Sequence, residues 1–454
     1  MPPPSHTRST VSNTSCSPSV EAASRSGSLR WHCVDSERRG GHDMKFNTTA
    51  ATAALMMASA FGSIRCGPVG AQELEREFID PAGVFTQVVT VADRGVKTIY
   101  VSGQVGNGDD LAMHVETAFE SVVRRLESAG ASTSDVVKIR IFVKDFDPAD
   151  YSIISQARLR TFSDEDSWPT STMVGIQELF LEQFRVEIEA VAVVADPEVP
   201  GANVTVERIG SSRGFSQAVV VTANGTKTIY VSGQVGQGDG LAEQATSVMA
   251  NVARRLETAG ATTDDVVKLV TYIFDYSPED LRAYGAARTR VFGSEDLPAS
   301  TLLGVQSLAA DQFEIEVDAV AVVSDGGGGE VAREFIDPTG GFTQVVTARG
   351  SGAKTIYISG QVGRAGESVE KQADQAYANL RRRLEAAGAT PADLIKLTIY
   401  MANYSSEDAA VLSAAQRNGF SDENLPATTL IGVVSLYSST ALFEIEGVAV
   451  VGGS

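Results

Sequence analysis

The chain has 454 residues, 43% of them apolar and 21% charged, a composition typical of a globular protein with about three domains of ordinary size. Residues 1–71 hold seven Lys/Arg and four Asp/Glu, so the remainder carries 30 basic against 53 acidic residues, a net charge of −23. A surface this negative repels phosphates and anionic lipid headgroups, which argues against nucleic acid as a partner.

Cysteine and histidine are concentrated at the N-terminus. All three cysteines and three of the four histidines lie within residues 1–71, and His114 is the single histidine that follows. The later part of the chain therefore cannot form a disulfide, a Cys/His metal cluster, a thiolate nucleophile or a repeated Ser-His-Asp triad. We expect no metal and no cofactor, and chemistry based on carboxylates, hydroxyls, Arg/Lys, backbone groups or water.

The N-terminal segment divides into two parts. Residues 1–43 are rich in Ser, Pro and Arg without apolar periodicity, which predicts a disordered extension. Residues 44–71 combine Lys45, the apolar run 50–64 and small residues before Gln72, which is typical of a signal peptide and predicts a periplasmic or secreted protein. An apolar mobile tail is the alternative. No other apolar run reaches the roughly 20 residues of a membrane span.

The rest of the chain contains one unit three times. The string Lys-Thr-Ile-Tyr-x-Ser-Gly-Gln-Val-Gly begins at Lys97, Lys227 and Lys354, a spacing of 130 and then 127 residues. This spacing is too long for a solenoid repeat, so each unit should be a domain with its own core. We predict domains at 72–196, 203–325 and 331–454, joined by short Pro- or Gly-rich linkers.

The elements of the first unit follow from its periodicity. Alternation predicts strands at 85–91, 98–102, 137–143, 171–177 and 185–194, and steps of three and four predict helices at 115–126 and 148–162. Gly130 is expected to end the first helix. The order β-β-α-β-α-β-β predicts an α+β fold, a mixed sheet with both helices on one face.

Helices on one face leave the other face of each sheet bare. Three such faces within one chain can cover each other around a pseudo-threefold axis, as the subunits of a cyclic trimer do. We therefore expect an intramolecular pseudo-trimer that is a monomer in solution. Small-molecule ligands should bind at the seams between units.

Several motifs or close variants of them occur in the same order in each unit: Ser-Gly-Gln, an Ala-Gly helix end, Asp-Val-Val-Lys (Asp-Leu-Ile-Lys in the third unit), Pro-Ala-x-Thr (Pro-Thr-Ser-Thr in the first) and Glu-Ile-Glu before an Ala/Val run. As a set they resemble the Rid (YjgF, reactive intermediate deaminase) superfamily over 77–194, 208–323 and 334–451. The resemblance implies a chorismate-mutase-like fold and trimers with clefts between subunits. It also implies hydrolysis of enamines and imines of amino acids to keto acids and ammonia.

The resemblance implies three site positions in each unit. The glutamate that positions the attacking water is matched, through Glu-Ile-Glu, by Glu187, Glu314 and Glu444. The carboxylate-binding arginine, two residues after a proline, is replaced by Ser171, Ser300 and Thr428, and a cleft-lining tyrosine by Phe85, Phe215 and Phe342. Arg158 and Arg288 could replace the arginine, but the third unit has Gln416 there, and we expect both arginines to be solvated helix charges.

Other polar positions have plainer interpretations. Glu189, Glu316 and Glu446 are expected to form a solvent-facing stripe, and the Ser-Gly-Gln glycines to supply positive φ at a strand end rather than a phosphate loop. Two functions stay open: a Rid-type hydrolase of small imines or enamines, and a non-catalytic small-molecule-binding scaffold, which the missing arginine favours. RNA cleavage fits poorly with the negative charge and the absence of a histidine pair.

Overall fold

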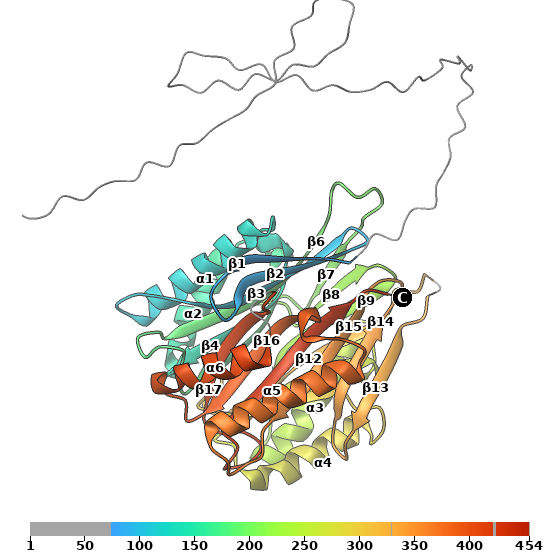
Figure 1. The fold of residues 1–454 in the computed structure, drawn as a ribbon. Coiled ribbons are helices and arrows are strands. Elements are labelled where there is room, and N and C mark those ends of the chain that lie inside the picture. Colours follow the sequence, from blue (N-terminus) through green and yellow to red (C-terminus); the bar gives the residue numbers. More distant parts are fainter. Residues whose placement is uncertain (1–73, 328, 421–423, 454) are drawn as a thin grey trace, which may run out of the picture. The chain divides into compact units, whose positions relative to one another are not determined.

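A computed structural model describes residues 74–327, 329–420 and 424–453. The predicted N-terminal extension and signal peptide lie outside these residues. The described part consists of three repeats with the same order of elements, coloured from blue to red in Figure 1. Within it, no helix has the length and apolar character needed to cross a membrane.

Each repeat has six strands and two α-helices. The first contains β1 (Glu75–Pro81), β2 (Thr86–Asp93), β3 (Val96–Val105), α1 (Leu111–Ser128), β4 (Val136–Lys144), α2 (Tyr151–Thr161), β5 (Thr170–Ile176) and β6 (Val186–Ala195). The second contains β7 (Thr205–Ile209), β8 (Ala218–Ala223), β9 (Thr226–Val235), α3 (Leu241–Thr258), β10 (Val266–Phe274), α4 (Leu281–Phe292), β11 (Ala299–Val305) and β12 (Ile315–Ser324). The third contains β13 (Ala332–Pro338), β14 (Thr343–Arg349), β15 (Lys354–Val362), α5 (Val369–Ala386), β16 (Leu394–Ala402), α6 (Ala409–Gly419), β17 (Ala427–Val433) and β18 (Phe443–Val451). The α+β fold class is confirmed.

One strand at the start of each repeat was not predicted. β1, β7 and β13 are edge strands that pair only with the following strand among the described residues. Their charged residues, such as Glu75, Arg76 and Glu77, are common on sheet edges and obscure the apolar alternation. Arg76 also forms an ion pair of 2.8 Å with Asp393 of the third repeat, so the edge strand contributes to a seam.

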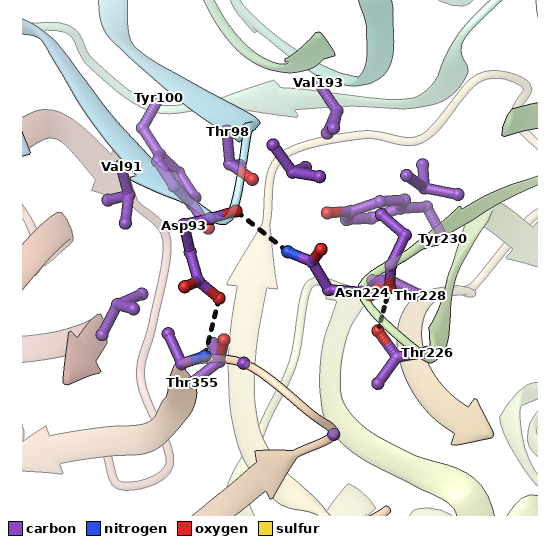
Figure 2. Close-up of a pocket in the computed structure, with 17 residues that line it drawn as sticks. Val91, Asp93, Thr98, Tyr100, Val193, Asn224, Thr226, Thr228, Tyr230 and Thr355 are labelled. Atoms are coloured by element: carbon purple, nitrogen blue, oxygen red, sulfur yellow. Dashed lines mark hydrogen bonds between the residues drawn. The ribbon is translucent and has the colours of Figure 1, made fainter. Parts of the chain in front are cut away.

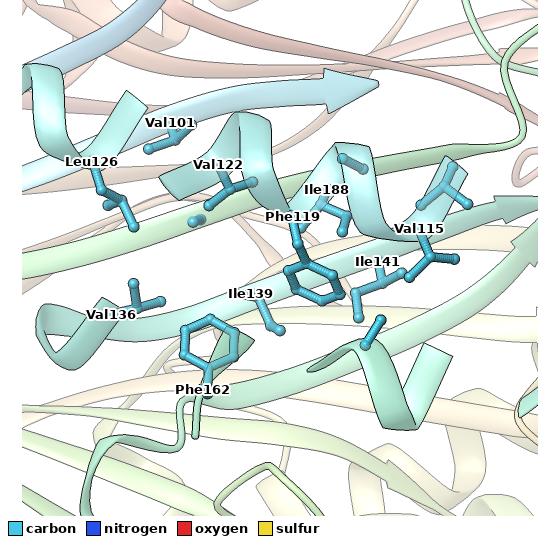
Figure 3. Packing of buried hydrophobic residues seen from close by; sticks show 14 of the residues in the cluster. Val101, Val115, Phe119, Val122, Leu126, Val136, Ile139, Ile141, Phe162 and Ile188 are labelled. Atoms are coloured by element: carbon cyan, nitrogen blue, oxygen red, sulfur yellow. The ribbon is translucent and has the colours of Figure 1, made fainter. Parts of the chain in front are cut away.

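The sheet of the first repeat has the order β1-β2-β3-β6-β4-β5. All neighbours are antiparallel except β4 and β5, which are parallel, and the other two repeats follow the same scheme. Helix α1 packs on β3 and β6 through its apolar face. In the resulting core, shown in Figure 3, the rings of Phe119 and Phe162 meet edge to face at 6.1 Å. The predicted helix end is confirmed, since Gly130 has φ +75° just after the C-cap.

The three repeats join edge to edge in a closed cycle. The backbone N–H of Ser216 donates to Pro169 O (2.8 Å), that of Thr343 to Pro298 O (3.2 Å), and that of Thr86 to Pro426 O (3.1 Å). The third repeat therefore contacts the first as the first contacts the second. The sheet faces opposite the helices share one apolar cluster that includes Phe142, Tyr272 and Tyr400, which is the arrangement expected of a pseudo-trimer.

Candidate functional site

Each seam between two repeats holds a cavity. The cleft between repeats 1 and 2 (cleft 1/2) measures about 580 Å³, that between repeats 2 and 3 (cleft 2/3) about 520 Å³, and that between repeats 3 and 1 (cleft 3/1) about 500 Å³. In each cleft one repeat contributes its second helix and fifth strand. The next repeat contributes its first helix, its third and sixth strands, and residues at or just before the start of its second strand. The clefts thus repeat one design three times.

The register of the sheets identifies the glutamate of each cleft. Glu187 lies opposite Val105 and Phe142, Glu444 opposite Val362 and Tyr400, and Glu316 opposite Val235 and Tyr272. These three residues line clefts 3/1, 2/3 and 1/2, respectively.

The prediction of Glu314 as the equivalent of Glu187 was therefore wrong. Glu314 precedes β12 and occupies the place of Arg185, because the Glu-Ile-Glu string of the second repeat stands two residues earlier relative to the Ala-Val-Ala-Val-Val run. The expected stripe was also wrong. Glu316 is the cleft residue, and Glu189 and Glu446 are buried in ion pairs with lysines.

The Ser-Gly-Gln motif forms a β-bulge that holds each glutamate. The register shifts between Val101 and Gln104, and at the same place in the other repeats. A Cβ on Gly103 would lie 1.6 Å from Glu187 Oε1, and a Cβ on Gly233 would lie 1.7 Å from Glu316 Oε1. Neither glycine has a positive φ. The motif therefore needs glycine for the close approach of a carboxyl group, not for the left-handed backbone that the sequence suggested.

Burial changes the acidity of these carboxyl groups. Together with the charge of a neighbouring carboxylate (Glu189, Asp318 or Glu446), burial raises the pKa of Glu187, Glu316 and Glu444 to about 8. At neutral pH each glutamate therefore mostly holds a proton, yet can release it near that pH. A pKa in this range suits a group that both donates and accepts protons during a reaction.

Two arginines of the second helices reach the clefts. Arg158 in α2 is 2% exposed and donates from Nη1 to Ser171 Oγ (3.1 Å) and from Nη2 to Arg213 O (3.0 Å). Its guanidinium lies 4.9 Å from the centre of the Phe215 ring. Arg288 in α4 is 8% exposed and lines cleft 2/3. The expectation that both are solvated helix charges was wrong.

The clefts bring the other predicted positions together. Ser171 and Phe215 line cleft 1/2, Ser300 and Phe342 line cleft 2/3, and Thr428 and Phe85 line cleft 3/1. In each pair the hydroxyl comes from one repeat and the phenyl ring from the next. Among the described residues no three His, Cys, Asp or Glu side chains are placed to hold a metal ion.

Sequence reasoning missed a glutamine–arginine pair in every cleft. The glutamine of Ser-Gly-Gln accepts from the arginine near the end of the first helix: Gln104 from Arg125 (3.2 Å), Gln234 from Arg255 (3.1 Å) and Gln361 from Arg383 (3.3 Å). Arg125 and Arg383 also pair with Asp80 and Asp337. The second repeat has Gly210 at that place, so Arg255 has no acidic partner within the described part of the chain. The occurrence of both residues in all three units was the available signal.

Cleft 3/1 differs from the other two. Gln416 stands where Arg158 and Arg288 stand, and its side-chain amide donates to Val84 O. Thr428 Oγ1 donates to Pro426 O (3.1 Å). The wall is completed by apolar side chains such as Phe180 and Leu412. This cleft therefore keeps the glutamate and Arg125 of α1 but lacks the arginine of the second helix.

Comparisons with known proteins identify the family of the three repeats. The family model described as Endoribonuclease L-PSP matches residues 76–194, 205–323 and 333–451. A 2-iminobutanoate/2-iminopropanoate deaminase from Dermatophagoides farinae is 31% identical over 122 residues, 25% of this chain and 88% of that protein.

Solved structures include relatives of single repeats. A member of the YjgF/YER057c/UK114 family from Mycobacterium tuberculosis is 27% identical and covers 27% of this chain and 100% of that chain, with a TM-score of 0.23. A chorismatase structure is 14% identical and covers 70% of this chain and 93% of that chain, with a TM-score of 0.46. Because the three matches of the family model span most of the sequence, this protein belongs to the Endoribonuclease L-PSP family, the Rid (YjgF) superfamily indicated by its motifs, with three tandem domains.

Proposed function

We propose that the protein hydrolyses small imines or enamines that carry a carboxylate, and that it does so in clefts 1/2 and 2/3. One observation carries the proposal. Arg158 Nε and Glu316 Oε2 are both buried without a hydrogen-bond partner among the described residues, and both residues line cleft 1/2. Arg288 Nε and Glu444 Oε2 repeat this in cleft 2/3. A buried polar atom without a hydrogen-bond partner destabilises the folded state, so binding of a ligand that hydrogen-bonds to these atoms is favoured.

The guanidinium is the group that binds the substrate carboxylate. A carboxylate accepts two parallel charge-assisted hydrogen bonds from an arginine, which fixes its orientation as well as its position. Arg158 reaches the cleft from α2, and its bond to Ser171 holds it beside the strand position where a Rid-type arginine is expected. An arginine on a helix thus takes the role of one on the neighbouring strand.

The buried glutamate supplies the proton transfers. Protonated Glu316 donates its proton to the imine nitrogen, which makes the carbon electrophilic. Water then attacks that carbon, the C=N electron pair moves to nitrogen, and the carboxylate takes a proton from the attacking water. In the second half the glutamate protonates the amine as the C–N bond breaks, and accepts the hydroxyl proton as the C=O bond forms. Imine and water become carbonyl compound and ammonia, and the glutamate ends as it began.

Charge distinguishes the three clefts. Cleft 1/2 is lined by Arg158, Arg254 and Arg255, with Glu316 as the nearby acid, so it is the strongest candidate for an anionic substrate. Cleft 3/1 has Gln416 in place of the helix arginine and a more apolar wall. We assign to it an uncharged ligand, the one place where the non-catalytic binding function is favoured.

The test is ammonia release from 2-iminobutanoate generated by an amino-acid oxidase. Changing both Arg158 and Arg288 to Gln should lower kcat/KM about 10- to 100-fold, the value of one or two charge-assisted bonds. Arg160→Gln combined with Arg290→Gln, both on exposed sides of α2 and α4, removes the same two charges outside the clefts and should change little. Equal rates for the double variant and the control would refute the role of the helix arginines.

A further inference from the structure

The centre of the pseudo-trimer contains a set of buried ion pairs that the clefts do not use. Each lysine of the Asp-Val-Val-Lys position, or its equivalent, pairs with a carboxylate of another repeat: Lys138 with Asp318 (2.8 Å), Lys268 with Glu446 (2.7 Å) and Lys396 with Glu189 (2.7 Å). These three pairs balance in charge and follow the cyclic arrangement of the repeats.

Arg140 adds a fourth cation to this balanced set. It binds Asp318 through Nε (3.0 Å), and both Glu189 and Glu446 through Nη1 (3.3 Å each). The register of the parallel strands places Val270 and Thr398 at the same position in the other repeats, so the arginine occurs once. Four cations and three carboxylates are therefore buried together, and an uncompensated buried charge strongly destabilises the folded state.

The nearby acidic groups do not remove this excess. The pKa of Glu189, Asp318 and Glu446 is lowered by the same lysines and arginine, so all three already count as charged. Glu187, Glu316 and Glu444, with pKa values raised to about 8, are mostly neutral at pH 7. Burial and, after it, the charge of Arg140 lower the pKa of the Lys138 ammonium.

A cavity adjoins these cations. The axial cavity, of about 90 Å³, is lined by Lys138, Arg140, Lys268 and Lys396, by Glu189 and Glu446, and by the rings of Tyr100, Tyr230 and Tyr357. Lys138 Nζ makes one hydrogen bond among the described residues, to Asp318, and so has donors to spare. Burial raises the pKa of the three tyrosines, so their hydroxyls keep their protons and can donate.

A second cavity leads toward this one. It measures about 140 Å³ and shares Tyr100 and Tyr230 with the axial cavity. Figure 2 shows hairpins from the three repeats around it, with Thr98, Thr228 and Thr355 on its wall. Its one carboxylate, Asp93, accepts from the backbone N–H of Ala353 (2.8 Å). The path to the cations is therefore lined mainly by hydroxyls and apolar groups.

We propose that the axial cavity binds one small monovalent anion, which accepts hydrogen bonds from Lys138, Arg140 and the tyrosine hydroxyls. A single negative charge matches the single excess cation, and the volume suits a halide or a small oxyanion. This site is separate from the clefts and independent of the function proposed for them.

The test uses bromide as the probe and the full chain. At constant ionic strength, replacing gluconate, which is too large for the cavity, by bromide should raise the Tm along a saturating curve. Arg140→Thr, which installs the residue of the third repeat, should abolish this rise. Arg290→Thr removes an equal charge on an exposed surface and should preserve it.

A second variant keeps the inference testable if Arg140→Thr does not fold. Tyr230→Phe removes one hydroxyl donor and should weaken the apparent bromide affinity several-fold. Crystals soaked in bromide should show an anomalous peak in the axial cavity of the wild type. No peak there, or an unchanged saturating response in a folded Arg140→Thr variant, would overturn the proposal.

Discussion

Arg158 on α2 donates a hydrogen bond of 3.1 Å to Ser171 on β5, so a helix side chain ends beside the strand position from which the expected arginine is missing. The serine that replaces this arginine has a structural role here, because its hydroxyl oxygen accepts a hydrogen bond from the Arg158 guanidinium of the neighbouring helix. The same pair of positions, Arg288 and Ser300, lines the second cleft. The third has Gln416 and Thr428, and this difference makes the clefts distinguishable by experiment.

The stoichiometry of carboxylate binding should follow the arginines. By calorimetry, the keto acid 2-oxobutanoate should occupy two sites per chain, because two clefts carry an arginine from the second helix, Arg158 or Arg288. Gln416→Arg should raise the number to three, and Arg158→Gln should reduce it to one. Three sites in the wild-type protein would show that the arginines do not select the ligand.

The pH dependence of turnover should report the buried glutamates. The reaction starts from the protonated form of Glu316 and Glu444, whose pKa is raised to about 8. We expect kcat/KM to be level below this pH and to fall tenfold per unit above it. The profile should be measured from pH 6 to 10 with imine generation held in excess. A rate that instead rises through pH 8 would assign these groups as bases in the free enzyme.

The free energy of unfolding should also depend on pH through a buried cleft glutamate. Glu187 has a pKa of about 8 in the folded chain against an ordinary value of 4.5, so between these pH values the folded state binds more protons than the unfolded state. Its contribution to stability is complete below about pH 4.5 and is lost as the pH rises toward 8.

Glu187→Gln removes this dependence. Relative to the variant, the wild type should lose up to about 1.4 kcal/mol of unfolding free energy per pH unit inside that window. Urea unfolding at pH 5 and pH 8 measures the difference. A wild-type-minus-variant difference that does not change with pH would mean that Glu187 titrates normally.

The glycines of the Ser-Gly-Gln motif should matter for catalysis because they leave room for the carboxyl groups of the cleft glutamates. Gly233→Ala combined with Gly360→Ala places a Cβ within 2 Å of the carboxyl oxygens of Glu316 and Glu444, which must then move. We expect activity to fall at least tenfold. Gly340→Ala is the control, because nothing lies within 4 Å of its Cβ and its φ is ordinary. Equal activity of the two variants would exclude a positional role for the motif.

Much of the fold could be predicted from the sequence, since each core strand and helix has a clear apolar period. The residues Val115, Phe119, Val122 and Leu126 predicted α1, and all four are buried. The cyclic arrangement followed from the repeat count and the bare sheet faces. The strand β1 was missed because it carries the charged residues typical of a sheet edge, and these hide the apolar alternation that marks a core strand.

The site was predictable only in part. A short motif such as Glu-Ile-Glu can be matched in two registers that differ by two residues, and both place the carboxylates on the same sheet face. The Ala-Val-Ala-Val-Val run that follows indicates the register of Glu316, and its cross-strand partners, Val235 and Tyr272, establish it. The direction of Arg158 depends on how α2 lies over the neighbouring repeat, a tertiary relationship that no local pattern contains.

The most direct test of the account compares wild-type protein with the Glu316→Gln, Glu444→Gln double variant in the 2-iminobutanoate assay. We predict ammonia release well above the rate in buffer for the wild type. For the double variant we predict a loss of about 100-fold or more in kcat/KM, the usual value of a proton-transfer group. Wild-type protein that releases ammonia no faster than buffer, or a double variant with full activity, would contradict it.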